Sequence, residues 1–479
     1  MKKQLFAALI AIVFIGSNAL AYYGPNDKSK KPTGKPKANC SPATAKYIME
    51  FNDVRALIEQ GGSMFQNRQN GVAAYEVPKG SNRFAIFAGA LWMGGTDVNG
   101  QLKLAALRYR AGNDFWPGPL SVTPGTGNYN PLFPVGDGAI RDFGEANIDP
   151  DQCIAYDQFY TIRKAEVIRF NIWWECQAGI TTECDDVQAP SNEELNRIYN
   201  WPAHGDVSKG QDYFLAPYYD RDQDGNYNPD NGDHPWYDDI LGRDDIQCGF
   251  DRRISLFGDE THWWVFNDKG NIHTETNGDP IGMEIRAQAF SFATNDEVNK
   301  MTFYNYELIN RGTQTLYDTY FAQYLDADVG NYADDYAGCD VSRGLGYMYN
   351  GDLNDENDGG KLGYGDNPPA IGCDFFEGPY QDADGIDNPG PYFDNATQSL
   401  VVPTVVDALA NNGIVYKGIG IGYSDGIIDN ERFGMRRFTY YTSTSAYPYN
   451  DPGPAAEFYN FMEGQWANGS AMYYGGLGS

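Results

Sequence analysis

Residues 282–309 read GMEIRAQAFSFATNDEVNKMTFYNYELI, and this stretch decides the fold class. Near both of its ends, apolar or aromatic side chains alternate with polar ones, which is the period of a β-strand with one buried face. Similar runs precede and follow it, so strands are predicted at 263–266, 282–292, 300–309 and 315–325. Turn-forming residues at 267–270 and 310–312 separate these runs, and the region therefore predicts an antiparallel β-sandwich.

A β-hairpin is predicted nearer the N-terminus. The apolar and aromatic run 83–93 and the extended run 102–109 flank the sequence DVNG at 97–100. Asp, Asn and Gly in such a short connection are typical of a tight hairpin turn.

Helical spacing or capping residues favour three helices, at 41–58, 157–175 and 191–199. Ser191 is the expected N-cap of the third, because acidic residues follow it in the first turn. We therefore predict a mainly β protein with a few short helices and an antiparallel β-sandwich core. Long loops rich in Gly, Asp and Asn, which we expect to bind calcium, complete this fold class.

We divide the chain into six regions by composition. They are a signal peptide (1–21), a basic flexible linker (22–39), an N-terminal α+β region (40–200), an acidic calcium-loop region (201–260), a β-sandwich region (261–350) and an acidic, loop-rich C-terminal region (351–479). Truncation of the last region is a hypothesis, because its sequence ends without a closing strand or a charged terminus.

The first 21 residues have the three parts of a secretory signal. Lys2 and Lys3 are followed by the apolar run 5–15 and by the small-residue site Ala19-Leu20-Ala21. The apolar run is too short to span a bilayer, and no later stretch is long and apolar enough to do so. We expect a secreted or cell-surface protein without a transmembrane segment.

The charge balance restricts the partners. The chain has 65 acidic and 35 basic residues and a formal net charge of −30. Such a surface repels nucleic acid and anionic lipid and attracts divalent cations, so we expect no nucleic-acid partner.

The stretch 220–233, DRDQDGNYNPDNGD, has the pattern of a calcium loop. Carboxylates at alternate positions followed by a glycine suit a hard cation, because the glycine permits the sharp bend that turns them inward. Position twelve is Asn231 in place of a bidentate Glu, and Pro229 opposes a departing helix, so this is not a complete EF-hand. A solvated acidic turn is the alternative. The ligands predicted here are Asp220, Asp222, Asp224, Asn226 and Asp233.

Three acidic clusters follow further along the chain. We predict metal ligands in them at Asp326, Asp328, Asn331, Asp334, Asp335, Asp382, Asp384, Asp387, Asp425 and Asp429. Several such turns in an exported protein favour calcium as a structural cofactor. Solvated turns remain the alternative for part of the set.

Seven cysteines leave one thiol free or paired between molecules. Cys176 and Cys184 are the expected local disulfide, and a bond between Cys339 and Cys373 is a second hypothesis. The absence of a C-x-x-C pair argues against a zinc ribbon or a thioredoxin-type site.

Hydrolase motifs are weak. Residues 422–426, GYSDG, match a nucleophile elbow, but that fold needs a histidine after Ser424, and the last histidine is His273. A zinc site from His262 and His273 is less favoured than polar loop histidines.

A glycosidase needs only two well-placed carboxylates, so composition neither excludes nor locates one. Trp263 and Trp264, with Trp236 and Tyr237, are candidates for stacking on sugar rings, and a role in the core is the favoured interpretation.

Five short runs carry a resemblance to a known group of proteins. They are GGSM at 61–64, FAGALWMGG at 87–95, NDFWPGPL at 113–120, DDYAGCD at 334–340 and DNERFG at 429–434. From about residue 53 onward the chain resembles exported Bacteroidota proteins that are cargo of type IX secretion. The resemblance implies export and surface placement and carries over no catalytic residues. Residues 234–256 look like an insertion, and no sorting domain follows Ser479.

These observations favour a secreted, calcium-stabilised structural or adhesive protein, exported by type IX secretion, over an enzyme. A secreted carbohydrate-active protein, either a glycan-binding module or a glycoside hydrolase, is the alternative. The expected partners are calcium ions and either glycans or other surface proteins.

Overall fold

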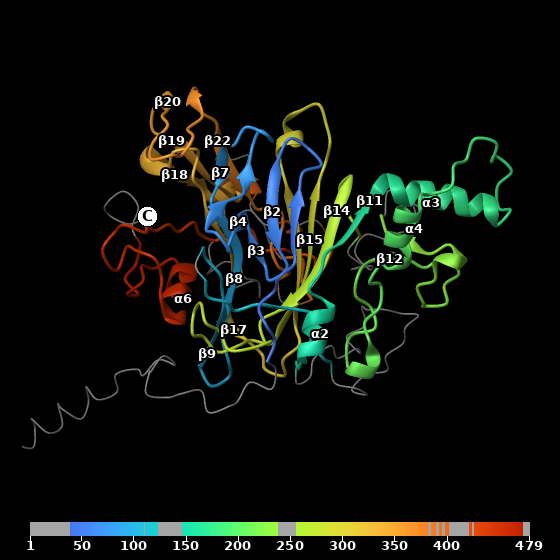
Figure 1. Cartoon of the computed structure of the whole chain (residues 1–479). Helices are drawn as coiled ribbons and strands as arrows, with labels where there is room; N and C mark the ends of the chain where they lie inside the picture. Colours follow the sequence, from blue (N-terminus) through green and yellow to red (C-terminus); the bar gives the residue numbers. More distant parts are fainter. Residues whose placement is uncertain are drawn as a thin grey trace, which may run out of the picture.

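The computed structural model describes residues 39–109, 111–122, 146–237, 255–381, 385–388, 392–394, 398–401, 421–423 and 426–472. Over these residues the protein consists mainly of antiparallel β-sheets with a few short helices, as predicted (Figure 1). The signal peptide and nearly all of the basic linker lie outside the described residues.

The larger of two main sheets has eight strands and is built from distant parts of the chain. Its strands are β1 (Lys46–Met49), β2 (Arg55–Glu59), β3 (Ser63–Met64), β6 (Tyr75–Glu76), β7 (Phe84–Ile86), β8 (Ala88–Thr96), β9 (Leu102–Ala105) and β17 (Tyr317–Asp326). β8 pairs with β9 as the predicted hairpin, and the Oδ1 of Asp97 accepts hydrogen bonds from the N–H groups of Asn99 and Gln101 in the turn. On its other side β8 pairs with β17, more than 200 residues later in the chain.

The second main sheet has five strands. They are β10 (Trp116–Pro117), β11 (Tyr160–Arg163), β14 (Glu260–Asn267), β15 (Met283–Ser291) and β16 (Phe303–Asn310). β14, β15 and β16 pair in antiparallel order, which confirms the strands predicted from this stretch of sequence.

One hydrophobic core is shared by the two main sheets. Met64 and Met93 of the larger sheet belong to the same buried cluster as Trp264 and Ile285 of the smaller one. Each large apolar side chain buried in this way contributes about 1.5–3 kcal/mol to folding. α6 (Ala455–Glu463) extends the cluster, because its Phe458 ring lies 4.8 Å from the ring of Trp92.

β14 is buried on both of its faces. Trp264 and Phe266 point into the shared core, whereas Trp263 and Val265 point the other way into a second apolar cluster. That second cluster includes Phe170 of α3, a helix that packs over the outer face of the five-stranded sheet (Figure 1). Because successive side chains of a strand face opposite sides, β14 joins the two cores.

Shorter elements complete the fold. The remaining helices are α2 (Pro150–Ala155), α3 (Lys164–Gln177) and α4 (Asn192–Tyr199), and the 3₁₀ turns are Val207–Lys209, Pro229–Asn231, Glu297–Lys300, Tyr332–Asp334 and Val341–Arg343. Small sheets are formed by β4 (Gln66–Asn67) with β5 (Val72–Ala73), β12 (Tyr218–Tyr219) with β13 (His234–Pro235), β20 (Asn354–Asp355) with β21 (Gly365–Asp366), and β23 (Tyr392–Asp394) with β24 (Ser399–Val401). A three-stranded sheet contains β18 (Asp335–Asp340), β19 (Leu345–Asn350) and β22 (Ala370–Asp374).

The helix predicted over 41–58 is wrong. The segment forms the antiparallel hairpin of β1 and β2, in which Lys46 lies opposite Glu59. The apolar side chains that suggested one face of a helix are distributed over two strands and the turn between them. Pairing with neighbouring strands therefore overrides the local pattern.

The other two helices are confirmed, one of them only in part. α4 begins after Ser191, whose hydroxyl accepts a hydrogen bond from the N–H of Glu194 in a capping box, as predicted. α3 begins at Lys164, because the preceding residues from Tyr160 form β11 and pair with β14. The predicted start at 157 is therefore seven residues too early.

The predicted turn at 310–312 does not connect two strands that pair with each other. It connects strands of two different sheets. β16 belongs to the five-stranded sheet, and β17, which follows the turn, belongs to the eight-stranded sheet. Arg311 in this connection is fully buried.

Two disulfides join four of the cysteines that the structure describes. Cys176–Cys184 confirms the predicted local bond, and Cys40–Cys153 joins residues that are 113 positions apart. The hypothesis of a Cys339–Cys373 bond is wrong, because β19 lies between the strands that carry these residues, and both thiols are free. Two strand spacings, about 9.5 Å, exceed the span of a disulfide.

The Cys40–Cys153 bond is predicted to stabilise the fold more than the Cys176–Cys184 bond does. Closing the longer loop removes more entropy from the unfolded chain, and the expected loss in a Cys40→Ser/Cys153→Ser variant is about 4–5 kcal/mol, against about 2–3 kcal/mol for Cys176→Ser/Cys184→Ser. Chemical denaturation of the two variants beside the wild type measures both values. An equal loss in the two variants would contradict this ranking.

Candidate metal centre

The loop 220–233 is held at its base by a short antiparallel ladder. Tyr218 lies opposite Pro235 and Tyr219 lies opposite His234, so the chain leaves β12 and returns along β13. Gly225 has a φ of +81°, in the left-handed region that glycine tolerates best. The loop can therefore reverse direction there and turn its carboxylates to one side.

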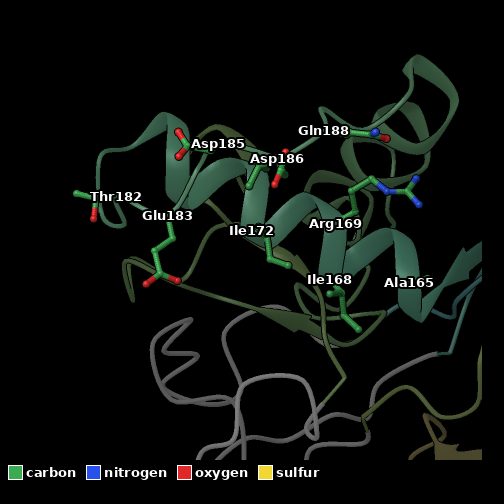
Figure 2. Close-up of a pocket in the computed structure, with 10 residues that line it drawn as sticks. Ala165, Ile168, Arg169, Ile172, Thr182, Glu183, Asp185, Asp186 and Gln188 are labelled. Carbon is green, nitrogen blue, oxygen red and sulfur yellow. The ribbon is translucent and has the colours of Figure 1, made fainter.

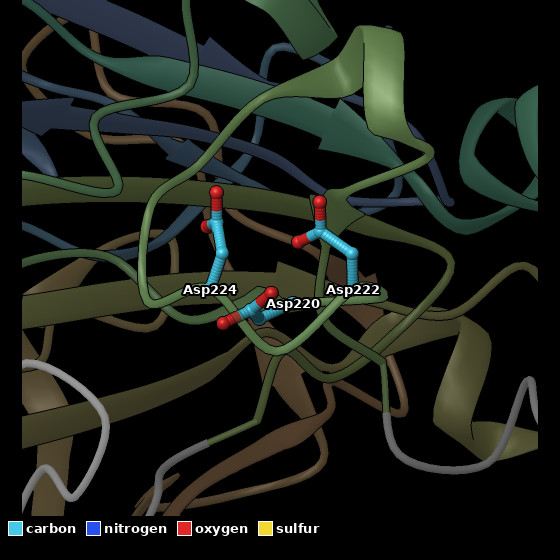
Figure 3. A group of neighbouring side chains, drawn as sticks. All are labelled: Asp220, Asp222 and Asp224. Carbon is cyan, nitrogen blue, oxygen red and sulfur yellow. The ribbon is translucent and has the colours of Figure 1, made fainter.

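Asp220, Asp222 and Asp224 converge as predicted. One carboxylate oxygen from each lies within 4.8 Å of the others (Figure 3). In the part of the chain that the structure describes, no other three acidic, histidine or cysteine side chains meet this condition. The Oδ2 of Asp220 accepts a hydrogen bond from the N–H of Gly225 at 2.8 Å, whereas its buried Oδ1 accepts none.

The other two residues predicted here shape the loop. Asp233 is fully buried, and its two oxygens accept hydrogen bonds from the N–H groups of Arg221 and Asn228, each at 2.9 Å. The Oδ1 of Asn226 accepts a hydrogen bond from the hydroxyl of Tyr213. Asp233 therefore connects the end of the loop to its beginning at Arg221 and to its middle at Asn228. Asn226 connects the loop to the preceding segment.

His204 connects the loop to the segment that precedes it. Its Nδ1 lies 3.0 Å from the carbonyl oxygen of Tyr213, and its Nε2 accepts a hydrogen bond from the N–H of Tyr227 at 2.7 Å. This pairing requires the neutral ring with the proton on Nδ1. Burial lowers the pKa of His204, in agreement with that tautomer.

Among the described residues, no salt bridge joins a basic side chain to a carboxylate of this loop. Burial raises the pKa of Asp220, and the neighbouring Asp222 adds to the effect. Burial also raises the pKa of Asp233 to about 6, although two backbone N–H groups oppose the shift. A cation among these oxygens would relieve the repulsion.

Arg221 is the basic residue of the loop, and its side chain is engaged elsewhere. The guanidinium lies 3.2 Å from Glu175 and 4.8 Å from the ring centre of Trp174, both on α3. Arg221 therefore fixes the loop to the helix, and its guanidinium forms no salt bridge with the triad.

A buried network anchors the preceding segment to the five-stranded sheet. Asp212 accepts hydrogen bonds from both Arg286 and Arg311 at 2.8 Å, and the same two arginines contact Glu284 at 3.0 Å. Burial alone would raise the pKa of Asp212, but the two arginines lower it below the ordinary value. Glu307, 3.7 Å from Arg286, completes the network, so two arginines face three carboxyl groups.

The second predicted cluster, at the end of β17, is less compact than the first. Burial and the nearby Asp328 raise the pKa of Asp326 to about 7, and burial with the neighbouring acids raises that of Asp335 to about 7. The Oδ1 atoms of Asp334 and Asp335 are buried and accept no hydrogen bond. Asp328 has one cation nearby, the Nζ of Lys361 at 3.9 Å.

Asp355 belongs to this second cluster and was not predicted. Its Oδ1 accepts a hydrogen bond from the N–H of Asn331 at 3.1 Å, and its Oδ2 accepts one from the N–H of Tyr364 at 2.6 Å. Asn331 therefore contributes its backbone to the cluster. Asp355 lies outside any D-x-D pattern, so only the approach of its loop to residues 328–335 reveals it.

The two C-terminal loops brace each other. The N–H of Gly385 donates to Asp429, and the N–H of Gly426 donates to Asp387, at 2.9 and 2.7 Å. Two acidic loops that were predicted separately thus form one unit. Asp382, Asp384 and Asp425 lie outside the described residues.

The aromatic residues and histidines that were candidates for sugar stacking or zinc binding are buried. Trp263, Trp264, Trp236 and Tyr237 are all buried and cannot stack on a sugar, so the core interpretation of these residues is confirmed. His262 and His273 are also buried, and His273 lies within hydrogen-bond distance of the carbonyl oxygens of Leu104 and Asp268 through its two ring nitrogens. Ser424, the proposed nucleophile, lies outside the described residues.

An open hollow of about 760 Å³ runs beside α3 (Figure 2). Ile168 and Ile172 line it from the helix, and its carboxylates, Glu183, Asp185 and Asp186, all come from one short loop. A glycosidase needs carboxylates on both sides of the scissile bond, and this arrangement does not supply them.

Comparison of the chain with protein-family models, curated proteins and solved structures gives no match. Within the described ranges, no helix combines the length and the apolar character needed to cross a membrane.

The cation-free loop is predicted to lose stability as pH rises from about 4 to about 6. The folded pKa of Asp233, about 6, exceeds the ordinary value of 3.8, so the folded state keeps a proton that the unfolded state has released. In this window the contribution falls by up to about 1.4 kcal/mol per pH unit. Denaturation of the cation-stripped wild type and of Asp233→Asn across this range measures the difference.

Asp186→Asn controls for the loss of one negative charge, because Asp186 is exposed and outside the loop. It should keep the pH dependence of the wild type, whereas Asp233→Asn should flatten it. Parallel curves for all three proteins would show that Asp233 carries no such proton.

Proposed function

We propose that the protein is an exported, calcium-stabilised surface protein with a structural or adhesive role. The convergence of Asp220, Asp222 and Asp224, with a buried oxygen of Asp220 that accepts no hydrogen bond, carries the proposal. A group of this kind is costly while it is empty, because its three negative charges repel one another and the buried Oδ1 of Asp220 accepts no hydrogen bond. A bound cation would offset the repulsion and hold the three carboxylates, and with them the loop, in one conformation.

The chemistry of the donors favours calcium. All three convergent groups are carboxylates, and oxygen ligands suit Ca²⁺ or Mg²⁺ and not the softer metals that prefer sulfur or imidazole. The loop is fixed by Asp233, His204 and Tyr218 and remains open on the side of the exposed Asp222 and Asp224. An open, adaptable loop suits the larger coordination number of Ca²⁺ better than the strict octahedron of Mg²⁺.

The fold and the compartment support the same function. The core shared by the two main sheets supports a face-to-face β-sandwich, an architecture common in extracellular domains. Two disulfides fit an oxidising compartment, in keeping with the predicted signal peptide. The resemblance to type IX secretion cargo is the basis for proposing that route of export.

Calcium is predicted to raise the melting temperature of the purified protein by several degrees at pH 7.4 relative to an excess of EGTA. A site that binds only the folded state adds about 2.7 kcal/mol when calcium is 100-fold above its Kd. Calorimetric titration with calcium chloride should show one bound ion fewer in Asp222→Asn/Asp224→Asn than in the wild type. Scanning calorimetry of both proteins, with calcium and with EGTA, measures the stability.

Asp185→Asn/Asp186→Asn is the matched control, because it removes two exposed carboxylates that do not belong to the triad. It should retain the calcium stoichiometry and the melting behaviour of the wild type. Identical melting of the wild type in calcium and in EGTA, with an unchanged stoichiometry in the triad variant, would refute the calcium assignment.

A further inference from the structure

The three-stranded sheet of β18, β19 and β22 carries tyrosines on one face. In its register Tyr336 lies opposite Tyr349, and Tyr347 lies between Gly338 and Gly372. Residues directly opposite one another in a sheet share a face, as do alternate residues along a strand. Tyr336, Tyr347 and Tyr349 therefore form one group, the tyrosine strip.

The tyrosine strip faces solvent, with exposed fractions of 59% for Tyr336, 38% for Tyr347 and 44% for Tyr349. The opposite face is covered at β22, where Ile371 packs against the main hydrophobic core, whereas Cys339 of β18 on the same face is exposed. In Figure 1 this sheet lies at the upper left of the molecule, at the periphery of the main sheets. Three adjacent exposed aromatic rings on one face of a sheet mark an interaction surface.

The three rings lie next to one another. The centroids of Tyr336 and Tyr349 are 6.1 Å apart with an interplanar angle of 27°, and those of Tyr347 and Tyr349 are 6.1 Å apart at 34°. At this separation and tilt the rings lie offset beside one another, so each leaves part of its face uncovered.

Glycines allow the rings to lie down on the sheet. A Cβ atom placed on Gly338 would lie 2.5 Å from the ring of Tyr347, and one on Gly351 would lie 2.7 Å from the ring of Tyr336. Both rings therefore occupy space that any larger residue would fill. The two rings can lie close to the backbone because glycine stands at positions 338 and 351.

Carboxylates lie at one end of the strip. Asp340 and Asp374 flank Leu345 on the same face, two positions along the strands from Gly338 and Gly372. Asp340 has Arg343 3.5 Å away, and Asp374 is exposed. The strip thus combines flat apolar rings with hydrogen-bond acceptors of negative charge.

We propose that the tyrosine strip binds neutral polysaccharide. A pyranose ring offers an apolar face of C–H groups that stacks on an aromatic ring, and its hydroxyl groups donate hydrogen bonds to carboxylates. Asp340, Asp374 and the overall charge of −30 repel anionic glycans, so charge complementarity selects neutral chains. Three exposed rings next to one another offer a surface on which successive sugar rings of a chain can stack.

This inference names the partner of the proposed adhesive role and rests on that role for its biological meaning. The tyrosine strip is separate from the Asp220 loop that carries the calcium assignment, although Tyr336 directly follows Asp335 of the second predicted cluster. Glycan binding and calcium binding can therefore fail separately in experiments.

The test is native affinity electrophoresis of the folded protein in gels that contain a polysaccharide. The panel holds neutral hydroxyethyl cellulose, xylan, mannan and starch, with anionic carboxymethyl cellulose as the charged counterpart of the first. We expect retardation by at least one neutral polymer, and weaker retardation by carboxymethyl cellulose than by hydroxyethyl cellulose. Retardation by none of the neutral polymers overturns the proposal.

Variants then locate the site on the polymer that binds. Each of Tyr336→Ala and Tyr349→Ala should weaken binding about two- to tenfold, the range expected for the loss of one aromatic contact. Tyr349→Phe should bind within about twofold of the wild type, because it keeps the ring. Gly338→Val should also weaken binding, since the added side chain displaces the ring of Tyr347.

Tyr317→Ala is the matched control, because Tyr317 is 51% exposed and lies on β17, outside the strip. It should bind like the wild type. Equal binding by Tyr317→Ala and by the strip variants, all with unchanged thermal melting, would place any glycan site elsewhere and overturn the proposal. Loss of calcium-dependent melting with retained polysaccharide binding would instead remove the calcium assignment and leave the strip intact.

Discussion

The burial of β14 on both faces is the constraint on which the rest of the structure depends. Trp264 and Phe266 fill the core between the two main sheets, and Trp263 and Val265 fill the core beneath α3 and α4. A strand that is covered on one face only could alternate apolar and polar residues, whereas β14 needs apolar residues on both. The helical layer and the loop that it supports therefore have a fixed position relative to the main sheets.

Electrostatics divides the molecule into two kinds of site. At the five-stranded sheet, Arg286 and Arg311 lower the pKa of the buried Asp212, so its charge is compensated by the protein itself. In the loops, burial and neighbouring acids raise the pKa of Asp233 to about 6 and that of Asp335 to about 7. Arg286 and Arg311 therefore compensate the carboxylate that connects the segment before the loop to the five-stranded sheet. Over the residues that the structure describes, no salt bridge reaches the Asp220 triad, and this is the physical basis of the proposed calcium dependence.

Local patterns were predicted well where the interaction that decides them is local. The β8–β9 hairpin has its turn at 97–100, and α4 has its capping box within four residues of Ser191. The Asp220 triad belongs to the same class, because its three carboxylates are separated by only one residue each. In each case the determining contacts lie within a short window, so the sequence contains the geometry.

Predictions that required distant partners failed or were missed. The segment 41–58 forms β1 and β2 because neighbouring strands are available for it, and its apolar spacing alone did not show that. The pairing of β17 with β8, the Cys40–Cys153 bond and the position of Asp355 join residues far apart in the chain. No periodicity or spacing encodes these contacts, since loop closure over such lengths is decided by the whole core.

By itself, the sequence determined the strand-rich character, the excess negative charge and the aspartate loops, because alternation, composition and short motifs depend on neighbouring residues. Only the tertiary structure decided which aromatic residues meet solvent. Trp263 and Trp264 are enclosed because both faces of their strand are covered, whereas Tyr336, Tyr347 and Tyr349 are exposed on a sheet at the periphery of the fold. The depth of an aromatic ring depends on what packs over its strand, and that is a property of the assembled layers.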